Sequence, residues 1–166
     1  EFYPDYARAA DGKILELGCG TGRVLIPVAA AGCEIVGLDI SEHMLARCRE
    51  KLRTQPREVQ ERVRLVHGNM VEFDLGEAFA LITTPFRVFQ HLVGVEEQLA
   101  CLRSANRQLK MGGRLILDLF QVFWDRMYYP RCMEESEDFA GVQLPEGRKL
   151  RRMHRIAAFH RAEQYN

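Results

Sequence analysis

Three glycines on alternate positions are the feature that most constrains the fold of this chain. Gly18, Gly20 and Gly22 stand between an apolar run at 14–17 and a helix-like segment at 24–31. Because glycine has no Cβ, it adopts positive φ and lets backbone N–H groups approach a ligand closely, at the point where a following helix leaves its first donors unpaired. The order strand, glycine turn, helix is typical of a nucleotide-binding α/β unit.

A carboxylate follows the glycine turn at the distance that such a unit requires. The second predicted strand ends in Asp39, and an acid about 20 residues after the first glycine accepts hydrogen bonds from ribose hydroxyls in βαβ units. Glu16, just before the turn, adds a negative charge that repels a diphosphate and attracts an amine. Gly22 and the following Arg23 do not fit the dinucleotide pattern G-x-G-x-x-G, so the spacing disfavours a pyrophosphate ligand.

The segment from Glu16 to Gly22 resembles the first motif of the class I S-adenosylmethionine-dependent methyltransferases, and Asp39 resembles their second. The resemblance extends over residues 3–120 and implies an α/β fold with a doubly wound, mostly parallel sheet of the Rossmann-like methyltransferase type. It also implies S-adenosylmethionine as cofactor, S-adenosylhomocysteine as product and a small molecule as methyl acceptor. Two other classes stay open, an NAD-linked oxidoreductase and a cofactor-binding protein without turnover.

Further candidate cofactor contacts lie at later strand and helix ends. Asn69 follows a strand predicted at 63–67, where the family usually has aspartate, and its amide oxygen can still accept a hydrogen bond from a purine amine. Met44 lies early in the helix predicted after Asp39, and its side chain either packs in the core or contacts an adenine face. Tyr3 either packs on the domain or, as the resemblance suggests, covers the cofactor. The predicted cofactor-binding residues are Glu16, Gly18, Cys19, Gly20, Gly22, Asp39, Ile40, Met44, Asn69, Met70, Thr84 and Tyr3.

The exit of the fourth predicted strand, 79–84, carries the candidate catalytic residues. Nucleobase and glutamine methyltransferases of the family have Asn/Asp-Pro-Pro-Tyr/Phe there, whereas this chain has Thr-Pro-Phe, which disfavours a nucleobase acceptor. The segment 85–92 instead resembles the small-molecule branch, in which it lines the methyl-transfer site. An acceptor hydroxyl or ammonium must lose a proton, so His91 is the candidate base, with Gln90 and Arg87 orienting the acceptor. A hydrogen-bonded, purely structural histidine is the alternative.

Two more elements complete the predicted sheet. The pattern predicts a helix at 95–109, with Leu99, Leu102, Asn106 and Leu109 on its apolar side and a stop at Gly112 and Gly113. A near-continuous apolar strand at 114–120 should be buried on both faces of the sheet. The ends of the five strands should meet in one crevice that contains Gly18, Asp39, Asn69, Thr84 and Asp118.

Composition excludes several classes of function. The chain has 166 residues, 47% of them hydrophobic, which suits one globular domain. Its 23 basic and 23 acidic residues cancel, so nucleic acid is an unexpected partner, and no apolar run is long enough to span a membrane. The five cysteines are scattered without C-x-x-C spacing and the histidines do not cluster, which predicts reduced thiols, no metal and a cytoplasmic location.

The chain divides at residue 120 in this interpretation. Residues 1–120 form the S-adenosylmethionine-binding domain, and 121–166 form a loop and a partial cap element with an acidic loop at 134–138. The basic stretch from 148 to 161 is either a solvated cap face, which we favour, or an RNA-binding tail, and it fits strand and helix equally. The family closes its sheet with two further strands, and at most one is recognisable here, around 150–159. We therefore expect an incomplete chain with an open sheet edge, which self-associates and binds adenosylhomocysteine with little methyl transfer.

Overall fold

The computed structural model describes residues 2–120, 134–144 and 146–154 of the chain. The chain forms two compact units, Glu1–Phe120 and Gln121–Asn166. The first contains a sheet with helices, and the second contains a two-stranded hairpin. None of the helices in these described residues is long and apolar enough to cross a membrane.

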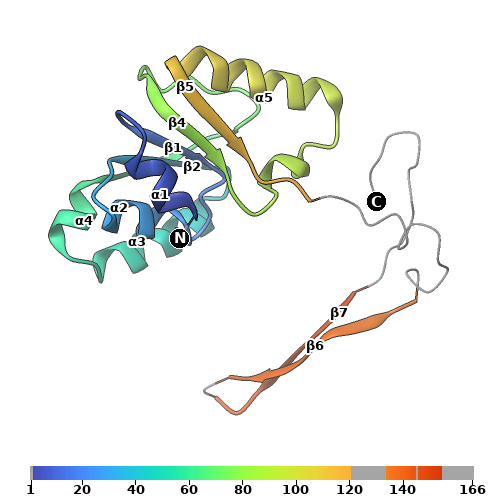
Figure 1. Cartoon of the computed structure of the whole chain (residues 1–166). Helices are drawn as coiled ribbons and strands as arrows, with labels where there is room; N and C mark the ends of the chain where they lie inside the picture. Colours follow the sequence, from blue (N-terminus) through green and yellow to red (C-terminus); the bar gives the residue numbers. More distant parts are fainter. Residues whose placement is uncertain (1, 121–133, 145, 155–166) are drawn as a thin grey trace. The chain divides into compact units, whose positions relative to one another are not determined.

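A five-stranded parallel sheet forms the centre of the first unit, in the order β3-β2-β1-β4-β5 (Figure 1). Its strands are β1 Ile14–Leu17, β2 Ile35–Asp39, β3 Val63–His67, β4 Phe79–Thr84 and β5 Leu109–Leu117. The strand order reverses beside β1, and ligands of open α/β sheets bind in the crevice at such a switch point. The predicted α/β doubly wound fold is confirmed.

Helices cover both faces of this sheet (Figure 1). They are α1 Phe2–Arg8, α2 Leu25–Ala30, α3 Glu42–Arg53, α4 Arg57–Glu61, the 3₁₀ turn η1 Val88–His91 and α5 Val95–Gln108. Successive residues of β1 point to opposite faces, so Ile14 packs with Leu25 of α2 while Leu15 packs in a second core with Ala105 of α5. All four residues of β1 are buried, as expected for the central strand of a parallel sheet.

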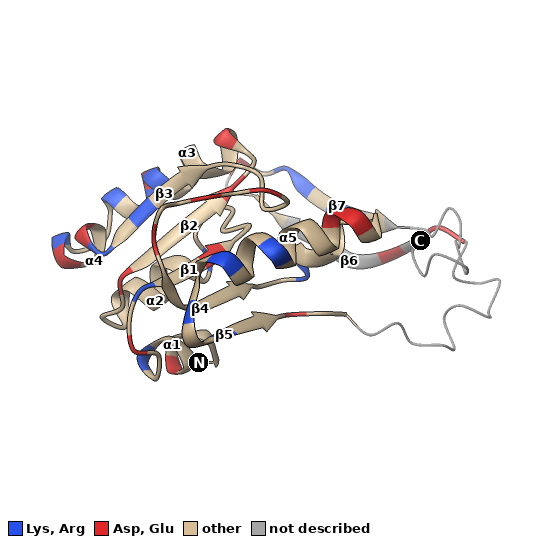
Figure 2. Cartoon of the chain, turned by 90° about the horizontal axis from the view of Figure 1, so that it is seen from above, with Lys and Arg blue, Asp and Glu red and all other residues tan. Residues whose placement is uncertain are grey.

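Side-chain capping and terminal charges stabilise two of the longer helices. Ser41 is extended and its Oγ accepts a hydrogen bond of 3.3 Å from the Met44 N–H, which caps the first turn of α3. Helix α5 has Glu96 and Glu97 in its first turn and Arg107 in its last, a charge order that complements the helix dipole (Figure 2).

The boundary between α5 and β5 differs from the prediction. Helix α5 ends at Gln108 and β5 begins at once at Leu109, so Gly112 and Gly113 lie inside the strand instead of ending the helix, and the strand starts five residues before the predicted 114–120. The pairing of β5 with β4 shifts register in this stretch. Gly112 adopts φ +75°, and a bulge of this kind uses the glycine that the sequence presented as a helix stop.

The predicted apolar side of α5 is confirmed for Leu102 and Leu109, which pack partly buried against the core, and is wrong for Leu99 and Asn106. Its buried side chains are Cys101, Ser104, Ala105 and Gln108, whereas Leu99 and Asn106 are exposed. Small side chains let the helix approach the sheet closely, and this contact outweighs the leucine periodicity. Strand β5 is only partly buried, because β4 is its sole neighbour within the described sheet, so the predicted burial on both faces is wrong as well. The self-association inferred from this edge stays a prediction.

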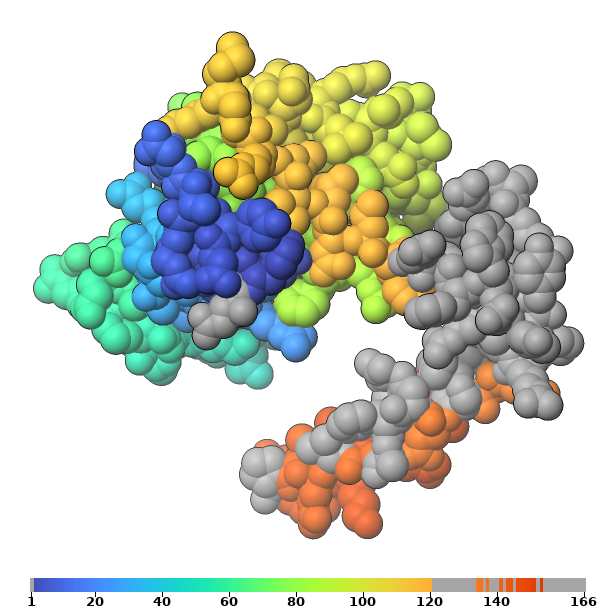
Figure 3. All heavy atoms as spheres, viewed as in Figure 1, coloured from blue at the N-terminus to red at the C-terminus, as the bar shows by residue number. Residues whose placement is uncertain are grey.

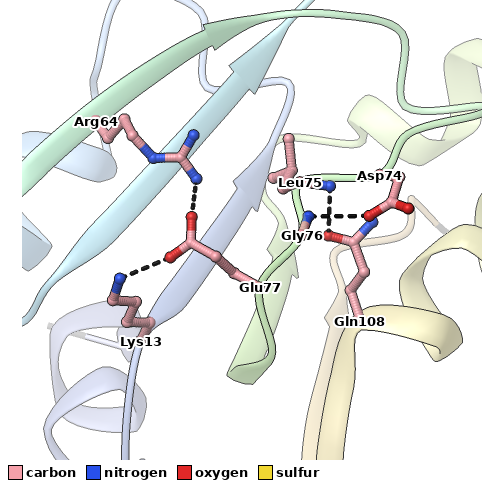
Figure 4. A network of polar contacts seen from close by, with 7 residues as sticks. All are labelled: Lys13, Arg64, Asp74, Leu75, Gly76, Glu77 and Gln108. Carbon is pink, nitrogen blue, oxygen red and sulfur yellow. Dashed lines mark hydrogen bonds and ion pairs between the residues drawn. The ribbon is translucent and has the colours of Figure 1, made fainter.

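Polar side chains fix the long connection between β3 and β4 (Figure 4). Gln108 of α5 accepts a hydrogen bond of 3.0 Å from the Leu75 N–H and donates one of 3.0 Å to the Phe73 carbonyl. Further along, Glu77 pairs with Lys13 at 2.6 Å and with Arg64. The connection is thereby tied to α5, to the residue before the central strand β1 and to the edge strand β3.

We expect Gln108→Leu to lower the free energy of unfolding by about 2–4 kcal/mol, because it leaves a buried N–H and a buried carbonyl without partners. Urea unfolding measures this change. Asn106→Leu, on the exposed side of the same helix, is the matched control and should stay within about 0.5 kcal/mol of the parent. Equal stability of the two variants would contradict the role given to Gln108.

The second unit contains an antiparallel hairpin of β6 Ser136–Gln143 and β7 Lys149–His154. The predicted acidic loop at 134–138 is therefore wrong from residue 136 onward, since Glu137 lies in β6 and pairs with Arg151 of β7 at 2.6 Å. The open choice between strand and helix is decided as strand for residues 149–154, and β6 was missed. The rest of the predicted basic stretch, 155–161, lies outside the described residues.

Candidate functional site

A pocket of about 440 Å³ opens at the carboxyl ends of β1, β2 and β3. The predicted site residues that line it are Gly18, Gly20, Asp39, Ile40, Met44, Asn69, Met70 and His91. Ile40 and Met44 are large apolar side chains that remain 67% and 40% exposed, so they offer an apolar surface beside the polar groups. A flat aromatic group with polar edges suits such a lining.

Asp39 connects the end of β2 to the glycine turn. Its Oδ2 accepts a hydrogen bond of 2.7 Å from the Gly20 N–H, and its Oδ1 accepts one of 2.8 Å from the Ser41 N–H. Each carboxylate oxygen has two lone pairs, so both oxygens can accept a further hydrogen bond from a ligand in the pocket. The carboxylate therefore shapes the turn and remains available for ribose hydroxyls.

The three glycines of the turn all have positive φ, at +69°, +52° and +78° for Gly18, Gly20 and Gly22. A Cβ at Gly18 would lie 2.2 Å from Cγ1 of Val88, which itself lines the pocket. A Cβ at Gly22 would lie 2.6 Å from Sγ of Cys48 in α3. Gly18 is thus required where the turn meets the pocket wall, whereas Gly22 lets the turn pack against α3.

Glu16 is a buried carboxyl group on β1, only 2% exposed. Its Oε2 has no hydrogen-bond partner within the described residues. Burial, with a further contribution from the charge of Asp39, raises the pKa of Glu16 well above its ordinary value of 4.5. The Glu16 carboxyl group is therefore buried without a hydrogen-bond partner for Oε2. A cationic group of a ligand could donate a hydrogen bond to this oxygen.

This burial predicts a pH dependence of stability. A group whose pKa is raised by folding stabilises the folded state below its unfolded pKa, and that contribution is lost as the pH rises towards the raised value. We expect the free energy of unfolding of the parent to fall as the pH rises from about 5 to about 8. Glu16→Gln should show a smaller fall, and it should be more stable than the parent at about pH 8. Urea unfolding at both pH values checks this. The exposed Glu50→Gln is the control, and an identical pH profile for Glu16→Gln and the parent would refute the assignment.

Five other predicted cofactor contacts do not line the pocket, namely Glu16, Gly22, Cys19, Thr84 and Tyr3. Cys19 is buried, and a Cβ at Gly37 would lie 2.7 Å from its Sγ, so its side chain packs in the core. Thr84 is fully buried at the end of β4, and its Oγ1 has no partner within the described residues. The Tyr3 hydroxyl donates to Oδ2 of Asp118 at 3.3 Å, which places Tyr3 on the β5 side of the crevice.

The three predicted catalytic residues separate into two groups. His91 is exposed and lines the pocket. The Gln90 amide instead binds the backbone of Phe120, donating to its carbonyl at 3.2 Å and accepting from its N–H at 2.6 Å. The Arg87 guanidinium lies 4.2 Å from the centre of the Phe120 ring. Gln90 and Arg87 thus fix the chain after β5, and their predicted role of orienting the acceptor is not supported by these contacts.

Several pocket residues were missed from the sequence. They are Leu38, Gly68, Val71 and Glu97. Val88 and Leu92 also line the pocket, and both lie in the segment 85–92 that the resemblance assigned to the methyl-transfer site. Glu97 gave no signal of a site, because an acid in the first turn of a helix is explained by the helix dipole alone. Among the described residues, no three His, Cys, Asp or Glu side chains gather as metal ligands would.

Comparison with known proteins adds the family evidence. Residues 14–113 match the family model described as "Methyltransferase domain". The chain is 32% identical over 112 residues to the cypemycin N-terminal methyltransferase of a Streptomyces species, covering 67% of this chain and 43% of that protein. It is 34% identical over 108 residues to the demethylmenaquinone methyltransferase of Staphylococcus aureus, covering 63% and 41%. The chain thus spans less than half the length of these relatives.

Solved structures resemble the fold as well. The glycopeptide N-methyltransferase MtfA in complex with S-adenosylmethionine superposes with a TM-score of 0.68 at 26% identity, covering 93% of this chain and 64% of that one. The CcbJ methyltransferase of Streptomyces caelestis gives 0.65 at 36% identity, with 69% and 46% covered. CalS10, an amino pentose methyltransferase of Micromonospora echinaspora with bound S-adenosylmethionine, gives 0.66 at 25% identity, with 96% and 75% covered.

Proposed function

Because the chain belongs to the methyltransferase domain family, we propose that it binds S-adenosylmethionine in the pocket at the carboxyl ends of β1, β2 and β3 and transfers its methyl group to a small molecule. One observation carries the proposal. The Asp39 carboxylate, at the end of β2, accepts a hydrogen bond from the Gly20 N–H and lines the pocket. Its oxygens retain lone pairs that can accept hydrogen bonds from a ligand there. A ribose with two vicinal hydroxyls matches this acceptor.

The other lining residues extend this placement along the ligand. Asn69, after β3, offers an amide to the edge of a purine, and Ile40 and Met44 offer apolar surface to its faces. In the absence of a ligand the Asn69 Oδ1 accepts from the Val71 N–H at 2.9 Å, which leaves its NH₂ group for a ring nitrogen. The buried Glu16 carboxyl, beside the glycine turn, complements the amino group at the other end of the cofactor. Oε2 of Glu16, which has no partner within the described residues, then accepts a hydrogen bond from that amino group.

The chemistry asks little of catalytic side chains. S-adenosylmethionine, when bound, supplies a methyl group on a positively charged sulfur, which is already an activated leaving group. The residues of this chain then align the acceptor in line with that methyl group and exclude water. His91 lines the pocket and can take up the proton of an acceptor hydroxyl or ammonium.

Two alternatives were open from the sequence. The family assignment disfavours an NAD-linked oxidoreductase, in agreement with Glu16 and with the spacing of the glycines. A cofactor-binding protein without turnover would have the same pocket, and only a measurement of methyl transfer distinguishes it from an enzyme. Several of the matched proteins are named for methyl transfer to nitrogen or to an amino sugar, and one is named for demethylmenaquinone, so their names support a small-molecule acceptor without selecting its class.

A labelled-methyl assay tests the proposal. The protein is incubated with S-adenosylmethionine carrying an isotope-labelled methyl group and with a panel of small amines, phenols and quinols, and mass spectrometry follows the label. We expect a small amount of labelled acceptor, in keeping with the little methyl transfer expected from the sequence, and an equal amount of adenosylhomocysteine. Binding of adenosylhomocysteine without transfer to any acceptor would favour the protein without turnover. Asp39→Ala serves as the control variant, in which weaker cofactor binding should lower the amounts of both labelled acceptor and adenosylhomocysteine. The cytoplasmic location stays a prediction.

A further inference from the structure

Asp118, directly after β5, is a carboxylate at the carboxyl edge of the sheet that the cofactor pocket does not use. Its Oδ2 accepts two hydrogen bonds, from the Phe86 N–H at 3.1 Å and from the Tyr3 hydroxyl at 3.3 Å. Its Oδ1 makes no hydrogen bond or ion pair within the described residues. The carboxylate is therefore held from two sides while one oxygen remains available.

Its position is on the far side of the glycine turn from the adenosine half of the pocket. The sheet order places β4 and β5 on one side of β1, and β2 and β3 on the other. Val88 contacts the glycine turn, since a Cβ at Gly18 would lie 2.2 Å from its Cγ1, and Phe86, two residues earlier, donates to Asp118. If the ribose of S-adenosylmethionine binds at Asp39, its methyl-bearing sulfur would lie near the end of β1. Asp118 would then lie on the β4 and β5 side of that sulfur, where the methyl acceptor could bind.

The end of β4 is built to hold this carboxylate. Phe86 and Arg87 both adopt positive φ, at +54° and +63°, which is strained for residues with a side chain. This turn directs the Phe86 N–H at Asp118. The space-filling view shows α1, which carries Tyr3, beside β5 on the surface (Figure 3). Two segments distant in sequence therefore converge on one carboxylate.

The charges near this place are mainly negative. Asp39 ends β2 and Asp118 directly follows β5, so two carboxylates lie at the carboxyl edge of the sheet. Two arginine side chains stack on aromatic rings of this region, Arg23 at 4.3 Å from the Phe86 ring centre and Arg87 at 4.2 Å from the Phe120 ring centre. Burial, followed by the charge of Asp118, raises the pKa of Tyr3 to about 12, so its hydroxyl stays protonated and acts as a donor to Asp118. Tyr3 holds the carboxylate in place and leaves its negative charge intact.

We propose that Asp118 is the acceptor-binding residue of this site and that it selects an acceptor carrying a primary or secondary amine. This inference rests on the proposed function. The acceptor ammonium donates a hydrogen bond to Oδ1 of Asp118 and loses one proton to His91, the base of the proposed function. The nitrogen lone pair then forms a bond to the methyl carbon, the bond between carbon and sulfur breaks, and its electron pair stays on sulfur. The methylated product carries the positive charge, which Asp118 stabilises as it forms.

Titration of the adenosylhomocysteine-loaded full chain tests this inference, with NMR chemical shifts as the readout. Glucosamine and alanylglycine amide are the amine probes, and glucose and N-acetylalanylglycine amide are their neutral counterparts. We expect each amine to bind at least about tenfold more tightly than its counterpart, the effect of one hydrogen bond to a charged group. Asp118→Asn keeps an oxygen for the Phe86 N–H and removes the charge, so it should abolish the preference.

Matched measurements separate the possible failures. The affinity for adenosylhomocysteine should stay unchanged in Asp118→Asn, which also shows that the variant is folded. Glu61→Gln removes an exposed carboxylate that pairs with Arg57 and should keep the amine preference. If the parent chain does not bind adenosylhomocysteine, the proposed function itself is refuted. Intact adenosylhomocysteine binding with no amine preference, or with a preference that survives Asp118→Asn, would refute the role of Asp118 alone.

Discussion

Gly18→Ala is expected to weaken adenosylhomocysteine binding by at least about 100-fold and to lower the free energy of unfolding by about 2–4 kcal/mol. Two effects add at this position. The residue has φ +69°, where a side chain costs about 1–2 kcal/mol, and its Cβ would lie 2.2 Å from Cγ1 of Val88. Relief of that contact displaces either the glycine turn or the pocket wall. Calorimetry and urea unfolding measure the two quantities.

Two further variants separate strain from steric overlap. Gly32→Ala has the same class of backbone strain, with φ +94°, but no atom within 4 Å of its Cβ, so it should lose stability without losing affinity. Val88→Ala in the Gly18→Ala background removes the overlap and should recover part of the binding. Equal effects of Gly18→Ala and Gly32→Ala on affinity would show that the contact with Val88 does not shape the pocket.

Asp39→Ala is expected to reduce the affinity for adenosylhomocysteine by about 10- to 100-fold, because hydrogen bonds to a charged group contribute about 1.5–3 kcal/mol. The structure adds a second reason, since the carboxylate also accepts from the Gly20 and Ser41 N–H groups. Asp39→Asn keeps one carbonyl oxygen and should lose less than Asp39→Ala. Calorimetry on both variants distinguishes the charge from the loss of all acceptors.

A matched control uses another carboxylate that accepts from the backbone. Asp74 accepts from the Gly76 N–H at 2.9 Å in the connection before β4 and does not line the pocket. Asp74→Ala should leave the affinity unchanged. If Asp39→Ala binds adenosylhomocysteine as tightly as the parent, the proposal that Asp39 binds the ribose hydroxyls is wrong, whatever the result for Asp74→Ala.

The cofactor half of the site was largely predictable because its signals are local. The glycine turn, the acid after β2 and the polar residue after β3 each follow a short strand, and the carboxyl ends of parallel strands meet at one edge. The resemblance to the class I methyltransferases is confirmed by the family match. The described sheet supplies the expected strand ends, although Thr84 and Asp118 do not belong to the pocket at Asp39.

The acceptor half was less predictable because its contacts join distant segments. Nothing near Gln90 in the sequence indicates that its amide binds Phe120, and nothing near Tyr3 indicates Asp118. The start of β5 was missed for a related reason. Gly112 and Gly113 are equally consistent with a helix stop and with a bulge, and only pairing with β4 decides between them.

Calorimetric titration of the unmodified chain with adenosylhomocysteine and, separately, with NADH tests the central claim most directly. The pocket with Glu16 before its glycine turn and Asp39 at the end of β2 should bind adenosylhomocysteine at one site per chain. NADH should give no heat of binding, because its diphosphate meets a glycine turn whose spacing does not fit the dinucleotide pattern. Absence of adenosylhomocysteine binding, or tighter binding of NADH, would contradict the account.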